Sequence, residues 1–254
     1  MAETNVGSRD HRKQSLIARP ICDSFSSNLS EGLTMIHERP TSDSWKTKPT
    51  DRFILKWIKC HLSARITPRL LHINWLQPWI LTVFSAGLGI LAGIIYATGM
   101  GWLAGLTAAV SQVFDGVDGQ YARLTDRQSP AGAFWDSVLD RFADGAMMIG
   151  MILYLVRLPV HVSLWIIVVL GSLALIGSNG VSYSTSRAEN LGIDLGRPTL
   201  ASKGTRSAVM ILCALGTVCW PALPLLALMY LVIHPNAVLI MRLVRAHKSF
   251  GYNR

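Results

Sequence analysis

The sequence predicts an all-α integral membrane protein with six transmembrane helices, preceded by a juxtamembrane amphipathic helix and a disordered N-terminal tail. Half of the 254 residues are hydrophobic, only 15% are charged and the mean hydropathy is +0.35, which is a poor fit to a soluble domain. From residue 73 onwards, apolar runs near the length that a bilayer requires follow one another. The net charge of +9 is spread over the segments that flank these runs, without a nucleic-acid-binding motif, so we expect a basic membrane flank and no nucleic-acid partner.

The first 50 residues are polar and rich in Ser, Thr, Pro and charged residues, and they show no sustained apolar period. This composition predicts a mostly disordered tail. The tail lacks the apolar core of a secretory signal. Acidic residues in the tail argue against an organelle transit peptide, among them Glu3, Asp10, Asp23 and Glu31.

Residues 51–72 form the next predicted element, because apolar residues recur there at helical spacing with basic residues between them. The apolar positions are Phe53, Ile54, Trp57, Ile58 and Leu62, and the basic ones are Arg52, Lys56, Lys59, Arg65 and Arg69. This pattern is typical of a basic amphipathic helix that lies on an anionic cytoplasmic membrane surface. An ordinary amphipathic helix packed on the protein accounts for it equally well, and different faces of one helix can serve both purposes.

Six apolar segments follow and make up a predicted domain over 73–245. They cover residues 78–97, 101–122, 134–157, 161–183, 205–220 and 222–243. The second segment runs into a group of aspartates, so its polar end belongs at a membrane interface or in a cavity. The cysteines show no metal-ligand spacing, and we expect neither zinc nor a disulfide at Cys22, Cys60, Cys213 and Cys219.

Basic residues are concentrated on one side of the predicted membrane domain. The links at 119–133 and 184–206 and the C-terminal end are rich in Arg and Lys, whereas the opposite side carries Arg157. An excess of positive charge marks the cytoplasmic side. We therefore expect both termini, including a tail over 246–254, and the aspartate group to be cytoplasmic.

The most informative stretch begins at Asp115 and carries aspartates at helical spacing in an otherwise apolar chain. Two stripes would each share a helical face, the first made of Asp115, Asp118, Gly119 and Ala122 with Arg123 at its edge, and the second of Gly132, Asp136, Asp140 and Asp144. Carboxylates that face one another near a membrane repel and are costly to desolvate, so a cation is expected between them. Carboxylate oxygens suit a pair of hard divalent ions, Mg²⁺ or Mn²⁺.

The same stretch resembles the signature of the CDP-alcohol phosphatidyltransferase family, which specifies eight positions at fixed spacing. The matching residues are Asp115, Asp118, Gly119, Ala122, Arg123, Gly132, Asp136 and Asp140. The resemblance implies an integral membrane enzyme with a six-helix core, which transfers a substituted phosphoryl group from a CDP-linked donor to an alcohol and releases CMP. It also implies a homodimer.

The resemblance implies a role for each of these positions. Asp115, Asp118, Asp136 and Asp140 are the expected ligands of a two-metal site. Asp140 is also the expected catalytic base, which takes the proton of the acceptor hydroxyl. The expected nucleotide-binding residues are Asp118, Gly119, Ala122, Arg123, Gly132 and Thr82.

Several of these positions have physical reasons beside the resemblance. Small residues such as Gly119 let a nucleotide approach the backbone, although close helix–helix packing in a membrane also favours them. The planar, permanently charged Arg123 suits a bidentate contact with a phosphate. Thr82 follows Pro78 in an element that in the family often reads Pro-Asn-x-x-Thr, and this chain has Trp79 in place of the asparagine.

Two further runs, Asp136–Gly145 and Ser182–Gly192, resemble the inositol-handling members of the family, the phosphatidylinositol-phosphate synthases and the di-myo-inositol-phosphate-phosphate synthases. This resemblance implies an inositol-type acceptor whose phosphate is bound by basic residues. The expected acceptor-binding residues are Arg141, Asp144, Arg187 and Arg206. The sequence does not distinguish between two possible donors, CDP-diacylglycerol and a soluble donor of the CDP-inositol type.

A non-catalytic membrane protein, such as a small cation transporter, is the alternative hypothesis, because intramembrane carboxylates also mark ion pathways. The Arg123 side chain beside the glycine favours the enzyme, since an ion pathway has no need of a phosphate-binding arginine.

Overall fold

The computed structural model describes residues 45–46, 53–73, 75–159, 162–193, 195 and 201–251. Over these residues the regular secondary structure is helical and includes no strand, which confirms the all-α prediction. Apart from residues 45–46, the predicted tail over 1–50 lies outside the described residues, as do Arg52 and the side chains of Phe53 and Ile54.

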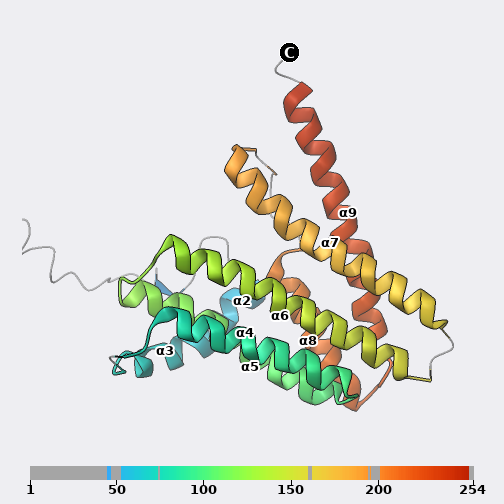
Figure 1. Ribbon diagram of the computed structural model, residues 1–254, viewed down its shortest axis with the longest axis horizontal. Helices are drawn as coiled ribbons and strands as arrows, with labels where there is room; N and C mark the ends of the chain where they lie inside the picture. The colour runs from blue at the N-terminus through green and yellow to red at the C-terminus, as the bar shows by residue number, and fades with distance from the viewer. Residues whose placement is uncertain are drawn as a thin grey trace, which may run out of the picture. The chain divides into compact units, whose positions relative to one another are not determined.

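In the described part of the chain, six helices occupy the six predicted segments (Figure 1). They are α4 (Pro78–Ala97), α5 (Gly101–Leu124), α6 (Pro130–Arg157), α7 (Leu164–Leu191), α8 (Lys203–Leu215) and α9 (Pro224–Gly251). Helices α5 and α7 continue past their predicted ends, so Arg123 and Arg187 lie on helices and not in loops. Helix α6 begins before its predicted start, because Pro130 occupies its first turn and the Ser129 hydroxyl caps it by accepting the Gly132 N–H at 3.0 Å.

Three of the described helices are long and apolar enough to cross a membrane by length and composition, namely α4, α7 and residues Pro224–His247 of α9. Helix α8 has 13 residues, so it is about 20 Å long and shorter than the roughly 30 Å hydrocarbon layer. A short 3₁₀ helix, η3 (Gly216–Val218), follows it. The three apolar helices agree with the prediction of an integral membrane protein.

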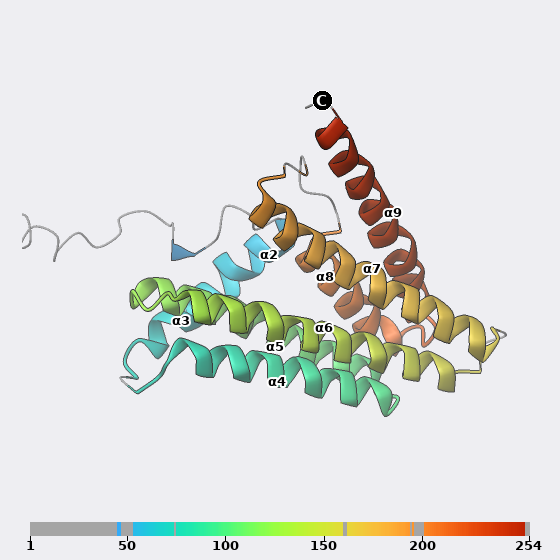
Figure 2. The same cartoon turned by 45° about the horizontal axis from the view of Figure 1, so that its top comes forward.

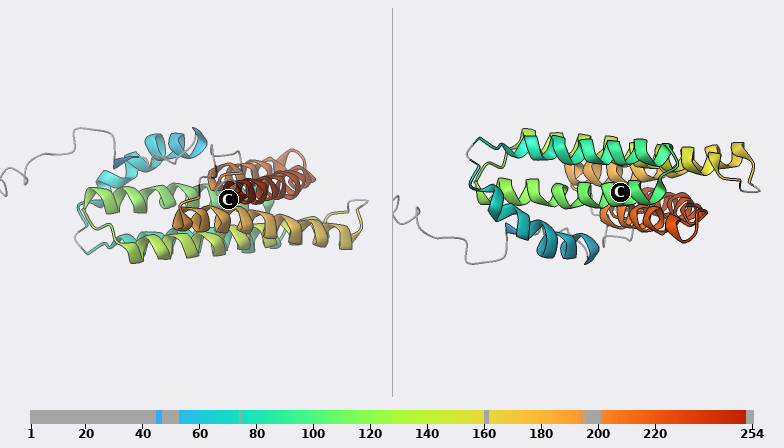
Figure 3. Two further views of the ribbon diagram at one scale, coloured as in Figure 1. Left: turned by 90° about the horizontal axis from the view of Figure 1, so that it is seen from above. Right: turned by 90° about the horizontal axis from the view of Figure 1, so that it is seen from below.

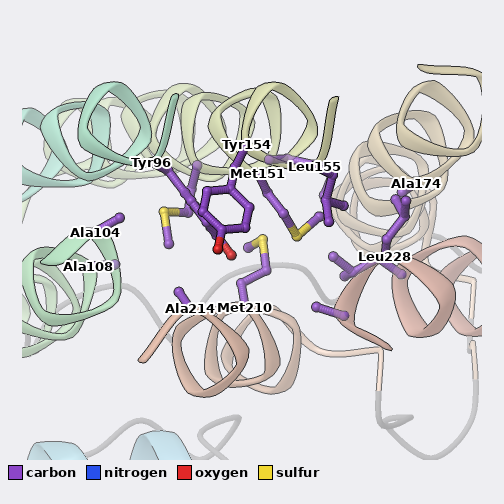
Figure 4. Packing of buried hydrophobic residues seen from close by; sticks show 14 of the residues in the cluster. Tyr96, Ala104, Ala108, Met151, Tyr154, Leu155, Ala174, Met210, Ala214 and Leu228 are labelled. Atoms are coloured by element: carbon purple, nitrogen blue, oxygen red, sulfur yellow. The ribbon is translucent and has the colours of Figure 1, made fainter. Parts of the chain in front are cut away.

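The helices pack around a buried core that is rich in methionine and alanine. Helix α4 packs against α5 and α6, α5 also packs against α8, and α7 packs against α9 (Figure 2). Figure 4 shows the rings of Tyr96 and Tyr154 next to each other, with their centroids 5.2 Å apart, and Met151 and Met210 beside them. This core holds together α4, α5, α6 and α8, the helices that carry the site residues.

The backbones of α4 and α6 touch through two glycines. A Cβ atom at Gly93 would collide with the backbone carbonyl of Ala146, and one at Gly150 would collide with the carbonyl of Gly93. Small residues allow this close approach of membrane helices. The contact fixes α6, which carries the second aspartate stripe, against α4.

The predicted amphipathic helix consists of α2 (Phe53–Ile58), the π-helical turn η2 (Lys59–Ser63) and α3 (Ala64–Leu70), which we call the juxtamembrane element. It lies against α5 (Figure 3). Its buried face carries Lys59, Ser63 and Thr67, whereas Trp57 is 57% exposed and Leu62 is 39% exposed. The element therefore packs on the protein through these polar residues together with the partly buried Ile66 and Leu70, which lie against Val117 and Tyr121. It leaves Trp57 and Leu62 exposed, as a helix at a membrane surface requires.

Candidate active site

Helices α5 and α6 bring the two aspartate stripes together. Asp115 lies on α5, and Asp136 and Asp140 lie one turn apart on α6. One carboxylate oxygen from each of these three residues falls within 4.8 Å of the others, and all three residues are half-buried. Three carboxylates this close repel unless a cation lies among them, and an all-oxygen set of donors suits Mg²⁺ or Mn²⁺. The residues therefore fit a divalent metal, and we call them the carboxylate cluster.

Lys203 contacts the carboxylate cluster, although sequence analysis did not assign it to the site. Its Nζ lies 3.0 Å from Asp115 Oδ1 and forms an ion pair with Asp140 Oδ2. The positive charge of the Lys203 ammonium offsets part of the repulsion among these carboxylates. Lysine in the first turn of α8 opposes the helix dipole, and this was the one local sign of a specific role.

Gln112 orients the first aspartate of the carboxylate cluster. Its Nε2 donates to Asp115 Oδ2 at 3.0 Å, and the residue is 8% exposed. The two residues are three positions apart on one helix, a spacing at which side chains meet. The sequence gives no signal for this role of Gln112, because a glutamine in an apolar helix belongs to no motif.

A cavity of about 830 Å³ lies beside the carboxylate cluster. Its lining includes every residue predicted to bind the nucleotide, namely Thr82, Asp118, Gly119, Ala122, Arg123 and Gly132. Asp136 belongs both to this cavity and to the carboxylate cluster, so the two features adjoin. Trp79, which replaces the family's asparagine, also lines the cavity, as does Trp135. We call this space the donor cavity.

The surroundings of Gly119 separate the two explanations for its small size. A Cβ atom there would lie 3.5 Å from the nearest atom, which belongs to the Arg123 side chain, and would meet no neighbouring helix. Helix packing therefore does not require glycine at this position. Space for a ligand beside the backbone explains it better.

Asp118 faces the donor cavity and lies outside the group formed by Asp115, Asp136 and Asp140. The side chain is buried, and its Oδ1 accepts the N–H of Gly119. Within the described structure its Oδ2 is buried without a hydrogen-bond partner. A buried carboxylate oxygen of this kind suits a cation or a ligand donor.

The four residues predicted to bind the acceptor lie in different surroundings. Asp144 lines a second cavity, of about 40 Å³, together with Asp115, Asp140 and Lys203. The other three line neither of these two cavities. Arg206 is buried and donates to Ala201 O at 2.7 Å and to Ser182 Oγ at 3.0 Å, Arg141 donates to Ser137 O, and Arg187 is exposed on α7.

The comparisons with known proteins agree with this geometry. Residues 75–244 match the CDP-alcohol phosphatidyltransferase family. The chain is 35% identical over 133 residues to a bifunctional IPC transferase and DIPP synthase of Thermococcus kodakarensis. The matched stretch covers 52% of this chain and 29% of that protein. It is 30% identical over 197 residues to a phosphatidylinositol phosphate synthase of Cutibacterium acnes, and this match covers 74% of this chain and 89% of that protein. The chain thus spans under a third of the bifunctional relative and most of the second.

A solved structure has the same fold. The crystal structure of the Mycobacterium tuberculosis phosphatidylinositol phosphate synthase with CDP-DAG bound matches with a TM-score of 0.64 at 21% identity, over 72% of this chain and 92% of that chain. The same protein has also been solved in complex with manganese and citrate. The match over residues 75–244 and the coverage of the Cutibacterium relative show that this chain belongs to the CDP-alcohol phosphatidyltransferase family of membrane transferases.

Proposed function

We propose that the protein transfers a substituted phosphoryl group from a CDP-linked donor to an alcohol acceptor and releases CMP, in a reaction that depends on a divalent metal. One observation carries the proposal: the residues expected to bind the nucleotide line one cavity, and that cavity shares Asp136 with the carboxylate cluster. A donor diphosphate in the cavity would thus lie next to three carboxylates that themselves require a cation.

The proposed metal ligands are Asp115, Asp118, Asp136 and Asp140, in a two-metal site for Mg²⁺ or Mn²⁺. Such ions neutralise the diphosphate and stabilise the charge that develops during transfer. The unpaired Oδ2 of Asp118 supports its inclusion. Lys203, which contacts Asp115 and Asp140, supplies part of the positive charge that the cluster needs.

Side chains of α5 and α6 would bind the donor and activate the acceptor. Arg123 would bind the diphosphate, while Gly119 and Ala122 leave room for the nucleotide beside the backbone of α5. Asp140 would take the proton of the acceptor hydroxyl, because an alcohol is a weak nucleophile until it loses that proton. Asp144, in the small cavity beside Asp140, is the best placed of the four proposed acceptor-binding residues.

The relatives favour particular substrates within the class. The proteins from Cutibacterium acnes and Mycobacterium tuberculosis are phosphatidylinositol phosphate synthases, and the second binds CDP-DAG. They support CDP-diacylglycerol as the first donor to test, with an inositol phosphate as the acceptor. A donor of the CDP-inositol type is the second candidate, because the name of the Thermococcus relative includes a DIPP synthase activity.

We further propose six membrane spans over α4 to α9, with both termini and the site on the cytoplasmic side. The basic links of the sequence support this orientation, because an excess of positive charge marks the cytoplasmic side. The homodimer implied by the family resemblance stays a prediction.

A donor-by-acceptor screen on the purified protein, with CMP as the readout, tests the proposed function. We expect CMP release with one CDP-linked donor and one alcohol, and none when either is left out. Absence of CMP release with every pair, together with divalent-cation flux in proteoliposomes, would instead support the transporter hypothesis.

Removal of divalent metal should abolish CMP release. A chelator would leave the clustered carboxylates without the ions that compensate the donor's charge, so turnover should fall to background. Mg²⁺ or Mn²⁺ should restore activity better than Zn²⁺, because all the proposed ligands are oxygens. Activity that persists in excess chelator would contradict the metal site.

Arginine variants should distinguish the residue that binds the donor from the residues that bind the acceptor. Arg123→Ala should raise the KM for the donor about tenfold or more, as expected for the loss of a charge-assisted contact. Arg187→Ala and Arg206→Ala should instead raise the KM for a phosphorylated acceptor. The Arg187 variant is easier to interpret, because Arg187 is exposed and its removal should disturb the fold little. Arg206 also donates hydrogen bonds to Ala201 O and Ser182 Oγ, so its removal changes local packing as well. Unchanged acceptor kinetics in both variants would contradict their proposed role.

A further inference from the structure

Gln120 joins three parts of the chain next to the donor cavity. It lies on α5 between Asp118 and Arg123, and it is fully buried. Its Nε2 donates to Lys46 O and to Lys59 O, each at 2.9 Å, and its Oε1 accepts the hydroxyl of Thr67 at 2.7 Å. These bonds use both N–H groups of the amide and its oxygen, so they determine which way the amide points.

The carbonyl just before Lys46 is bound by Arg123. Arg123 Nε donates to Trp45 O at 2.7 Å. The successive carbonyls of Trp45 and Lys46 are therefore held by two side chains that lie three positions apart on α5. While Nε is held by this bond, the two Nη atoms of the guanidinium lie next to Gly119. Both Arg123 and Gly119 line the donor cavity.

The juxtamembrane element also holds α5 just before Gln120. Ser63 Oγ donates to Val113 O at 2.8 Å, and a Cβ atom at Gly116 would collide with the Ser63 side chain. The part of α5 that carries Asp115 and Asp118 is therefore braced by residues that precede position 75, where the match to the family begins.

We propose that Gln120 is a positioning residue for donor binding. By holding Lys46 and the juxtamembrane element, it places the Trp45 carbonyl, and that carbonyl orients Arg123 towards the diphosphate of a nucleoside-diphosphate donor. This inference rests on the proposed function. It extends the support of the donor site to residues 45–46 and 59–67, which are not part of the lining of the donor cavity.

Gln120→Leu in the full-length protein tests the inference, because leucine fills similar space without the three hydrogen bonds. We expect the Kd for CDP, titrated calorimetrically with Mg²⁺ present, to rise about tenfold, as for the loss of a correctly oriented contact to a charged group. The donor KM should rise in parallel, and the acceptor KM should stay unchanged. In an Arg123→Ala background the same substitution should have no further effect on the Kd, because the two residues act through one contact.

Thr67→Val is a milder variant that keeps the side-chain volume and removes the hydroxyl, which contacts Gln120 Oε1 at 2.7 Å and also Ser63 O at 2.9 Å. It should raise the Kd for CDP roughly threefold, in line with a neutral hydrogen bond, and it covers the case in which Gln120→Leu fails to fold. Thr217→Val is the matched control, because that buried hydroxyl donates to Ala214 O and lies against Gly101, at the other end of α5. The control should leave CDP affinity unchanged.

Two results would overturn the inference while the proposed function stands. One is a lower unfolding temperature in Gln120→Leu and Thr67→Val with wild-type affinity for CDP, which would mean that Gln120 serves packing alone. The other is an equal effect of Gln120→Leu with and without Arg123. If the wild-type protein neither bound CDP nor released CMP, the proposed function itself would fail, and the inference with it.

Discussion

Asp136→Asn and Asp140→Asn should each abolish CMP release, with a loss of about a thousandfold or more. Both residues belong to the carboxylate cluster, and Asp136 also lines the donor cavity. An amide has nearly the same shape as a carboxylate but carries no charge, so the cluster would lose metal binding and, at Asp140, the proposed base. The measurement is single-turnover and steady-state CMP release at saturating donor, acceptor and Mg²⁺.

The same variants should insert into membranes and fold. Removal of one charge from a cluster of like charges relieves repulsion, so we expect the unfolding temperature of Asp136→Asn to be unchanged or higher. Asp126→Asn is the matched control: Asp126 is exposed after α5 and has a φ of 52°, a conformation that asparagine adopts as readily as aspartate. This control should keep full activity. Full activity in Asp136→Asn or Asp140→Asn would disprove the assignment of the site.

The largest effect on stability should come from Gly93→Ala, which we expect to cost about 3 kcal/mol. A Cβ atom at Gly93 would overlap the carbonyl group of Ala146, and backbone atoms cannot move aside as a flexible side chain can. Overpacking typically costs about 1–3 kcal/mol, and an obstacle made of backbone belongs at the upper end of that range. Thermal unfolding of the detergent-solubilised protein measures the effect.

Gly87→Ala makes the same change on the same helix and serves as the control. A Cβ atom at Gly87 would have nothing within 4 Å. Alanine favours a helix over glycine by about 1 kcal/mol, so this variant should be as stable as the wild type or slightly more stable. Since α6 carries Asp136 and Asp140, Gly93→Ala should also reduce CMP release. Equal unfolding temperatures for the two variants would contradict the close contact between α4 and α6.

Local patterns in the sequence were sufficient for the helices, and the structure brings three of the predicted metal ligands together beside a cavity lined by the predicted nucleotide-binding residues. The predicted segment over 78–97 coincides with α4, and Pro78 and the glycine-containing turn at its ends explain why. The prediction was less complete at α5 and α7, whose polar ends were assigned to loops although both helices continue through them. Hydropathy marks where an apolar run ends, and a helix that enters a polar cavity need not end there.

The juxtamembrane element shows a different limit. The apolar positions of this element do not show which of its side chains are buried, because the buried residues in its described part are the polar ones, Lys59, Ser63 and Thr67. Ile66 and Leu70 are partly buried beside them, against Val117 and Tyr121 of α5. A side chain is buried there when a partner exists for its hydrogen bonds, as Gln120 does for Thr67. Periodicity along one helix carries no information about such a partner.

The sequence by itself determined the helical segments, the spacing of the aspartates and, through that spacing, the family. These properties depend on neighbours within a few turns of one helix, which is the range over which periodicity and hydropathy act. Only the tertiary structure decided that Lys203 lies against Asp115, 88 positions away, and that Gln120 binds the carbonyl of Lys46, 74 positions away. Contacts of this kind depend on which helix faces pack together, and packing is settled by the close fit of whole surfaces, such as the glycine contact between α4 and α6.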